Sequence, residues 1–285
     1  MKKRKSTLKQ KMSEYKRTPG SFIMYLLIHL SAAVCVFFMV FIIAYILIKG
    51  VPNLNLDLFS WKYTSDNVSM MPAIINTLYI TALTLLFSVP VGVCAAVYLA
   101  EYAKRSSKLV RIIRITNETL AGIPSIVYGL FGFLAFVIFM GWSYSLIAGV
   151  LTLSIMVLPT IIRTTEEALL SVPDSYREGS FGLGAGKLRT VFKIIVPAAM
   201  PGILSGVILA IGRIVGESAA LIFTAGTSPV AATGLLDSTR TLSVHMYCLL
   251  SEGLYTKQAT AVVLLVVVIA INALSEFAAK KLTKA

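Results

Sequence analysis

Long apolar stretches constrain this chain more than any other feature of its sequence. Six stretches of about 20 residues or more carry few or no charged side chains. They lie at residues 22–48, 73–100, 119–140, 143–162, 198–223 and 259–279. A helix needs about 20 apolar residues to cross the hydrocarbon core of a bilayer, where it satisfies its own backbone hydrogen bonds. The sequence therefore predicts an all-α polytopic membrane protein with six transmembrane helices.

The composition excludes the common soluble classes. Of the 285 residues, 57% are hydrophobic and 14% are charged, whereas a soluble domain has about 25% charged residues. This disfavours a cytosolic enzyme, a secreted disulfide scaffold and a disordered tail. The three cysteines form no C-x-x-C pair and have no Cys/His spacing, so neither a disulfide framework nor a metal site is indicated. We expect no metal and no cofactor.

The basic residues indicate an orientation. If the six stretches cross the membrane in turn, 21 of the 26 Lys and Arg residues fall on one side. By the positive-inside rule, that side is cytoplasmic and holds both termini. The other side keeps Lys49, Lys62, Arg240 and Lys257, and Arg213 lies within the fifth stretch. The net charge of +13 therefore needs no nucleic-acid partner. We divide the chain into a basic cytoplasmic arm at 1–20 that contacts membrane lipid, a first transmembrane helix at 21–48, and a core domain at 73–280.

One loop on the cytoplasmic side, residues 163–197, is longer than the others. We expect a helix at 166–172, a second element beginning at Pro173, a break at three closely spaced glycines, and a short amphipathic piece at 187–196. The glycines do not form a nucleotide site, because Phe181 and Leu188 occupy positions where a P-loop needs Gly and Ser or Thr. A helix, a glycine turn and a helix on this face are typical of a docking element.

Arg213 and Glu217 are the two ionisable residues that lie well inside an apolar stretch. A charge at the bilayer centre costs at least about 2.5 kcal/mol, so such residues usually serve a function and face the interior of the bundle. The i, i+4 spacing places the two side chains on one face of a continuous helix. A pair that merely neutralises itself is the alternative, and we favour the functional interpretation.

The cytoplasmic loop resembles a known signature. Importer-type ABC permeases carry Glu-Ala-Ala, three residues, Gly, nine residues and Ile-x-Leu-Pro at this place. The matching residues here are Glu178, Gly179, Ser180, Gly184, Ile194 and Pro197. Gly and Ser replace the two alanines, and Val196 replaces Leu, while the spacing is kept without a gap.

A narrower resemblance covers the chain from about residue 70 to the C-terminus. Residues 121–132 (AGIPSIVYGLFG) and 213–219 (RIVGESA) are similar to segments of phosphate-import ABC permeases, A type. The resemblance implies the type I importer permease fold and a heterodimer with a second homologous permease. It also implies two copies of a cytoplasmic ATPase subunit and an external phosphate-binding protein. The signature residues would then couple this chain to the ATPase, and Arg213 with Glu217 would line the path of the phosphate anion.

The resemblance makes the chain a bacterial or archaeal plasma-membrane permease, not an enzyme, with ATP hydrolysis on a partner chain. Alternatives are the C-type partner permease of the same system and a permease for another oxyanion. An intramembrane enzyme is disfavoured because the apolar stretches contain no catalytic constellation. A secondary transporter is disfavoured because it would favour internal repeats, and the sequence shows no convincing one. We also expect a short interfacial helix in the outer loop at 224–257, where Leu242, Met246, Leu249 and Leu250 have near-helical spacing.

Overall fold

The computed structural model describes residues 19–104, 107–252 and 257–282, and these residues contain helices and no strand. Most of the predicted basic arm at 1–20 lies outside them. The longer helices are α2 (Pro19–Gly50), α3 (Met71–Val97), α4 (Lys108–Ala121), α6 (Leu146–Leu170), α9 (Val196–Gly216) and α12 (Lys257–Leu282). The shorter helices are α5 (Ser125–Gly132), α7 (Asp174–Gly182), α8 (Lys187–Thr190), α10 (Ala219–Thr224) and α11 (Leu242–Ser251). Two short 3₁₀ helices are η1 (Val51–Asn53) and η2 (Leu56–Phe59). Three π-helical segments are η3 (Tyr98–Tyr102), η4 (Phe133–Phe139) and η5 (Val191–Ile195).

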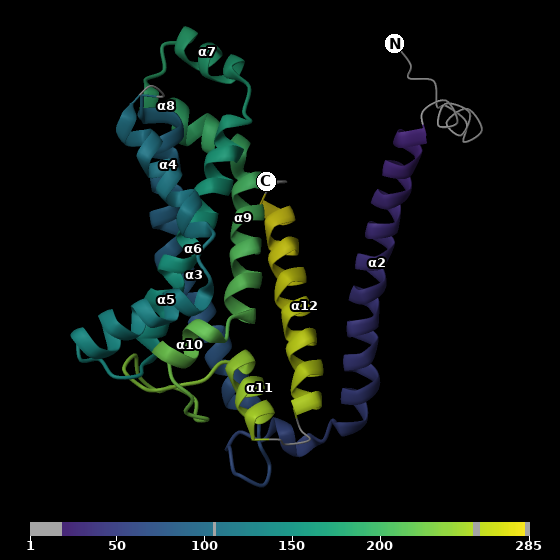
Figure 1. Ribbon diagram of the computed structural model, residues 1–285. Coiled ribbons are helices and arrows are strands. Elements are labelled where there is room, and N and C mark those ends of the chain that lie inside the picture. Colours follow the sequence, from purple (N-terminus) through teal and green to yellow (C-terminus); the bar gives the residue numbers. More distant parts are fainter. Residues whose placement is uncertain (1–18, 105–106, 253–256, 283–285) are drawn as a thin grey trace.

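Five helices among the described residues are long and apolar enough to cross a membrane, and a bent pair makes a sixth. The five are Ile23–Asn53, Met71–Tyr102, Leu146–Leu170, Lys187–Gly216 and Gln258–Lys281. They run roughly along one direction in Figure 1. The prediction of an all-α multi-pass membrane protein is confirmed.

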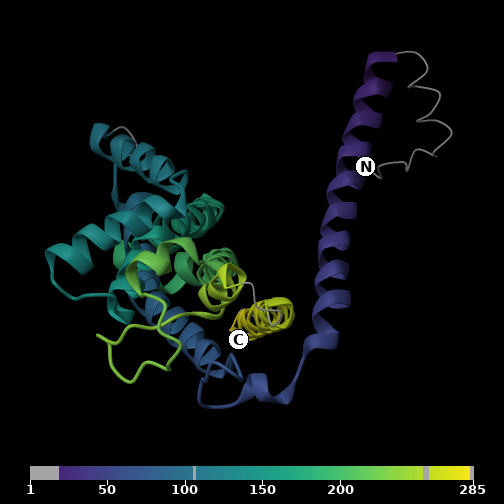
Figure 2. The same ribbon diagram turned by 60° about the horizontal axis from the view of Figure 1, so that its bottom comes forward.

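The third predicted span is not a straight helix. Its first residues belong to α4, and α4 and α5 meet at an angle of 101°. The break falls at Gly122 to Pro124, where proline has no N–H to continue the ladder and holds the preceding residue out of the helical region. Asn117 of α4 donates from Nδ2 to the Pro159 carbonyl of α6 (3.1 Å), so α4 packs along α6 while α5 and η4 turn across the bundle (Figures 1 and 2).

The fifth predicted span is also interrupted. We expected one helix over 198–223, but α9 ends at Gly216 and α10 begins at Ala219. Glu217 between them has extended backbone angles (φ −74°, ψ 130°). Hydropathy does not reveal this break, because the residues on both sides of it are apolar.

The core is built where α3, α6 and α9 pack together. The central apolar cluster includes Ile80, Leu153, Met156, Val157, Ile161 and Ile214. Beside it, α5 and α10 cross so closely that a Cβ on Gly129 would lie 2.8 Å from the Cα of Ala220. Only glycine permits this approach, and it brings the two interrupted spans together.

Helix α2 stands apart from this core. In Figures 1 and 2 it diverges from the bundle, and its apolar side chains are exposed along most of its length. It contacts α12 at the end opposite α7, where Gly50 is buried against the main chain of Gln258 and the side chain of Val262. A bilayer or a partner helix would cover such a surface.

The loop predicted at 163–197 is shorter than expected. Helix α6 continues to Leu170, because its C-terminal end is held by ion pairs and by packing against α9. Helices α8 and η5 run into α9 as one helix. The predicted element at Pro173 is present as α7, and the glycine turn follows it at 183–186. The helix–turn–helix shape is therefore confirmed with tighter limits. The predicted outer helix is present as α11, with Leu242 and Leu249 fully buried.

Candidate translocation and coupling sites

Arg213 lies in the last turn of α9 and faces a groove inside the membrane-spanning region. The groove has a volume of about 650 Å³. It is lined by Thr160 of α6, by Ile208, Leu209, Gly212 and Arg213 of α9, and by Asn272 of α12. The groove is largely apolar, with one charged and two uncharged polar side chains in its lining. A charge at membrane depth usually faces the bundle interior or a water-filled cavity rather than lipid.

The guanidinium of Arg213 makes no hydrogen bond and no ion pair within the described part of the chain. The Tyr128 side chain of α5 is close enough to feel its charge, but the Tyr128 hydroxyl donates to the Leu120 carbonyl (2.8 Å). A half-buried cation without a partner is costly in a low-dielectric setting. Such a cation is available to bind an anion.

Glu217 is not the partner of Arg213, so the expected pair on one helix face is wrong. The helix ends between the two residues, and the Glu217 carboxylate turns toward α10 instead. Its Oε1 accepts a hydrogen bond from the Ala220 N–H (3.1 Å), and its carbonyl accepts one from Ser243 Oγ (2.7 Å). The side chain is 8% exposed. A carboxylate at a helix N-terminus satisfies a free backbone N–H, so Glu217 stabilises the break.

The signature residues occupy α7 and the turn after it. Glu178 and Gly179 are exposed on α7, whereas Ser180 is buried and its Oγ lies 2.8 Å from Thr190 Oγ1 of α8. Gly184 has φ +81°, which non-glycine residues adopt only with strain. Ile194 and Pro197 belong to the helix that continues into α9. Movement of α7 would therefore reach α9 directly.

Sequence reasoning missed the residues that anchor α7. Arg177 forms an ion pair with Glu101 at the end of η3, in which both Nε and Nη2 donate to the carboxylate. The closest atoms are Nη2 and Oε1 (2.6 Å). Its guanidinium also donates to the main-chain carbonyls of Val172 (2.8 Å) and Leu169 (3.0 Å). The Glu101 side chain is 7% exposed. One arginine thus ties α7 to the C-terminal ends of both α3 and α6. The two charges are 76 residues apart in sequence, so no local pattern reveals their pairing.

The comparisons with known proteins decide the family. The profile of the binding-protein-dependent transport system inner membrane component family matches residues 88–285. The chain belongs to this family. The permease is 37% identical to the probable ABC transporter permease protein YqgI of Bacillus subtilis, over 79% of this chain and 81% of the relative. It is 34% identical to the phosphate transport system permease protein PstA of Haemophilus influenzae, over 84% of both chains.

Solved structures of ABC transporters share its fold. A chain of a bacterial alginate ABC transporter, crystallised with an alginate-bound periplasmic protein, matches the permease with a TM-score of 0.64 and 17% identity. The match covers 93% of this chain and 98% of that chain. A chain of the MetNI methionine ABC transporter in an inward-facing conformation matches with a TM-score of 0.55 and 20% identity, over 75% and 92%. The predicted type I importer permease fold is confirmed.

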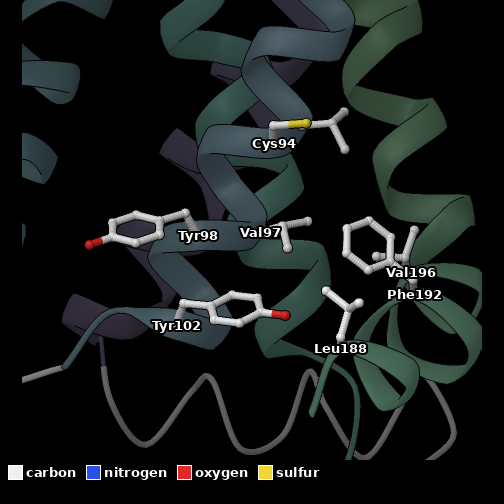
Figure 3. Close-up of a pocket in the computed structure, with 8 residues that line it drawn as sticks. Cys94, Val97, Tyr98, Tyr102, Leu188, Phe192 and Val196 are labelled. Carbon is white, nitrogen blue, oxygen red and sulfur yellow. The ribbon is translucent and has the colours of Figure 1, made fainter. Parts of the chain in front are cut away.

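An apolar pocket of about 350 Å³ lies between α3 with η3 and the helix formed by α8, η5 and the start of α9. Figure 3 shows Cys94, Val97, Tyr98 and Tyr102 from α3 and η3 on one side of it. Leu188, Phe192 and Val196 from α8, η5 and α9 face them from the other side. At the rim, the Lys187 ammonium lies 4.9 Å from the centre of the Tyr102 ring. The helix formed by α8 and η5, which joins α7 to α9, therefore leaves a gap against α3 along this side.

Proposed function

We propose that this permease is the A-type membrane-spanning subunit of an ATP-driven phosphate importer. The observation that carries the proposal is the unpartnered Arg213 guanidinium, which lines the groove together with Thr160 and Asn272. Relatives whose names include phosphate transport support the choice of anion: PstA of Haemophilus influenzae at 34% identity and PstA 2 of Mycobacterium tuberculosis at 37%. In this proposal Arg213 attracts and contacts the phosphate. Glu217 stabilises the break between α9 and α10, so that Arg213 in the last turn of α9 faces the path.

The permease would form half of a pore, with a second homologous permease supplying the other half. The exposed end of α7, with Glu178, Tyr176, Phe181 and Leu183 on its surface, would seat in a groove of one of two cytoplasmic ATPase subunits. An external phosphate-binding protein would deliver the anion to the opposite face. The chain would catalyse no reaction itself, since ATP hydrolysis belongs to the partner. Both termini would be cytoplasmic in a bacterial or archaeal plasma membrane, by the positive-inside rule.

Uptake of ³²P-labelled phosphate by the assembled importer in proteoliposomes tests this proposal. We expect ATP-dependent uptake, and we expect the Arg213→Gln variant to take up phosphate at least about tenfold more slowly, because a charge-assisted bidentate contact is lost. The matched control is Arg163→Gln, since Arg163 is exposed and pairs only with exposed Glu167 among the described residues. Normal uptake by an assembled Arg213→Gln complex would contradict the role of Arg213. Uptake of sulfate or another oxyanion in place of phosphate would contradict the proposal that phosphate is the substrate. Assembly of this chain in the position of the C-type partner would contradict the proposal that it is the A-type subunit.

A further inference from the structure

A second cluster of unpartnered polar groups lies at the outer end of the permease, away from Arg213. Eight buried side-chain N and O atoms lack a hydrogen-bond partner among the described residues. Five of the eight belong to the segment from Thr239 to His245: Thr239 Oγ1, Arg240 Nε and Nη2, and His245 Nδ1 and Nε2. Arg240 is 5% exposed and His245 is fully buried. Such a concentration in one short segment is unusual, because buried polar groups are nearly always hydrogen-bonded.

Neighbouring residues hold Arg240 in place through its main chain and the flat face of its guanidinium, and they make no hydrogen bond to Nε or Nη2. Its carbonyl accepts a hydrogen bond from Asn76 Nδ2 of α3 (3.2 Å), which fixes its main chain. Its guanidinium carbon lies 4.8 Å from the centre of the Tyr63 ring, which attracts the charge through the flat face of the cation. The in-plane N–H groups of Nε and Nη2 form the edge that binds carboxylate and phosphate with two parallel hydrogen bonds. That edge is buried and free.

No described carboxylate is within ion-pair distance of Arg240. A buried charge with neither a counter-ion nor hydrogen bonds on two of its nitrogens is destabilising, so Nε and Nη2 favour an added anion or water as a partner. Val68, in the loop that carries Tyr63, has φ +44°, which a β-branched residue adopts only under strain. Its main chain lies close enough to the His245 ring to act as a weak hydrogen-bond partner of one ring nitrogen, which leaves the other ring nitrogen for a ligand. A strained segment therefore covers the cluster.

His245 adds a second kind of hydrogen-bonding group beside the arginine. Its ring lies edge-on to the same Tyr63 ring, with 6.3 Å between the ring centres. Burial, together with the charge of Arg240, lowers the pKa of His245 to about 3. The imidazole is therefore neutral at physiological pH and offers one N–H donor and one N acceptor. A protonated oxyanion such as phosphate, which has both P–O acceptors and a P–OH donor, matches this set, whereas sulfate has no donor.

We propose that Arg240 and His245 form a second oxyanion site, at the outer mouth of the permease, that holds phosphate through the Nε–Nη2 edge of Arg240 and a ring nitrogen of His245. The naming of phosphate rests on the proposed function, whereas the oxyanion chemistry rests on the site itself. Tyr63 lies beneath the arginine and orients it. The anion would bind at this outer site before it reaches the Arg213 groove, so this would be the first binding site on the transport path.

The two histidines of the chain make a direct test practical. A His29→Gln variant, purified with a tag that lacks histidine and placed in lipid nanodiscs, leaves His245 as the only imidazole. The ¹⁵N resonances of that ring are followed while sodium phosphate, sulfate or chloride is added at constant ionic strength. We expect a saturable shift with phosphate, a weaker one with sulfate and none with chloride. Arg240→Gln should abolish the shift. Arg240→Lys should weaken it, since lysine keeps the charge but lacks the planar guanidinium that binds an oxyanion with two parallel hydrogen bonds.

The control variant is Lys62→Gln, which removes an exposed basic residue next to Tyr63 and should leave the shift unchanged. Because Arg240→Gln removes a buried group, its fold is checked by size-exclusion elution and by the resonances of the unliganded ring. In the assembled importer, the folded variant should raise the KM for phosphate uptake by roughly tenfold or more. An unchanged His245 spectrum in phosphate, or equal shifts in chloride, would overturn the site while ATP-driven phosphate uptake still held. A phosphate-dependent shift in a complex that transports no phosphate would overturn the proposed function and leave the site standing.

Discussion

At the residue scale, the turn after α7 depends on one glycine. Gly184 has φ +81°, whereas Gly182 two residues earlier has no positive φ, and a Cβ added at either residue would meet open space. The turn is closed by two main-chain hydrogen bonds, from the Gly184 N–H to the Phe181 carbonyl (2.9 Å) and from the Ala185 N–H to the Ser180 carbonyl (3.1 Å). Two of the three glycines recognised in the sequence are therefore replaceable, and one is not.

Gly184→Ala should loosen this turn, and Gly182→Ala should not. An L-residue in the left-handed region costs about 1–2 kcal/mol, whereas alanine at a helix end gains up to about 1 kcal/mol over glycine. Hydrogen exchange of the purified permease measures the difference. We expect the amides of Gly184 and Ala185 to exchange roughly tenfold faster in Gly184→Ala, and to exchange no faster than wild type in Gly182→Ala. Equal exchange in the two variants would show that the conformation is not strained.

At the element scale, hydropathy predicts where helices cross and not where they break. The spans that became α2, α3, α6 and α12 follow from apolar length alone, because a membrane helix satisfies its own backbone wherever it lies. The breaks before α5 and α10 depend on tertiary contacts. Pro124 is a readable signal for the first break. The second needs the Glu217 cap and the close approach of Gly129 to Ala220, which join segments far apart in sequence.

The anchor of α7 is likewise a tertiary feature, and it determines how the element moves. Arg177 and Glu101 are 16% and 7% exposed, so each side chain would be left as a poorly hydrated charge without the other. Breaking a buried pair from one side costs about 3–5 kcal/mol, and this partly exposed pair belongs at or below the lower end of that range. Asp174, the other carboxylate on Arg177, is 78% exposed and contributes little.

Arg177→Gln and Glu101→Gln should therefore each release α7 from the bundle, and Asp174→Asn should not. In the assembled importer we expect the first two variants to hydrolyse ATP with a lower ratio of phosphate transported to ATP consumed. The double variant should be no worse than the worse single variant, because the two side chains act as a unit. Thermal unfolding of the purified chain checks that the fold survives. Additive losses in the double variant would show that the two residues act separately.

At the scale of the whole molecule, the start of α2 and the end of α12 both point toward the end of the bundle that carries α7 (Figure 1). The loop containing Tyr63, the helix α11 and the Arg240 cluster lie at the opposite end. Most of the described Lys and Arg residues lie on the segments at the α7 end, so the positive-inside rule predicts that this end is cytoplasmic and the Arg240 end external. The roles proposed for the two ends both depend on this orientation, since an ATPase is available on one side of the membrane only.

Two exposed serines at opposite ends test the orientation directly. After the native cysteines Cys35, Cys94 and Cys248 are replaced by alanine, Ser65→Cys places a thiol in the Tyr63 loop and Ser175→Cys places one on α7. A membrane-impermeant maleimide added to intact cells, stripped of any outer membrane, should label Ser65→Cys at once. It should label Ser175→Cys only after the membrane is permeabilised, because a charged reagent does not cross the hydrocarbon core. The two serines are similarly exposed, so the variants control for each other. Labelling in the reverse order would place α7 outside and exclude its coupling to a cytoplasmic ATPase.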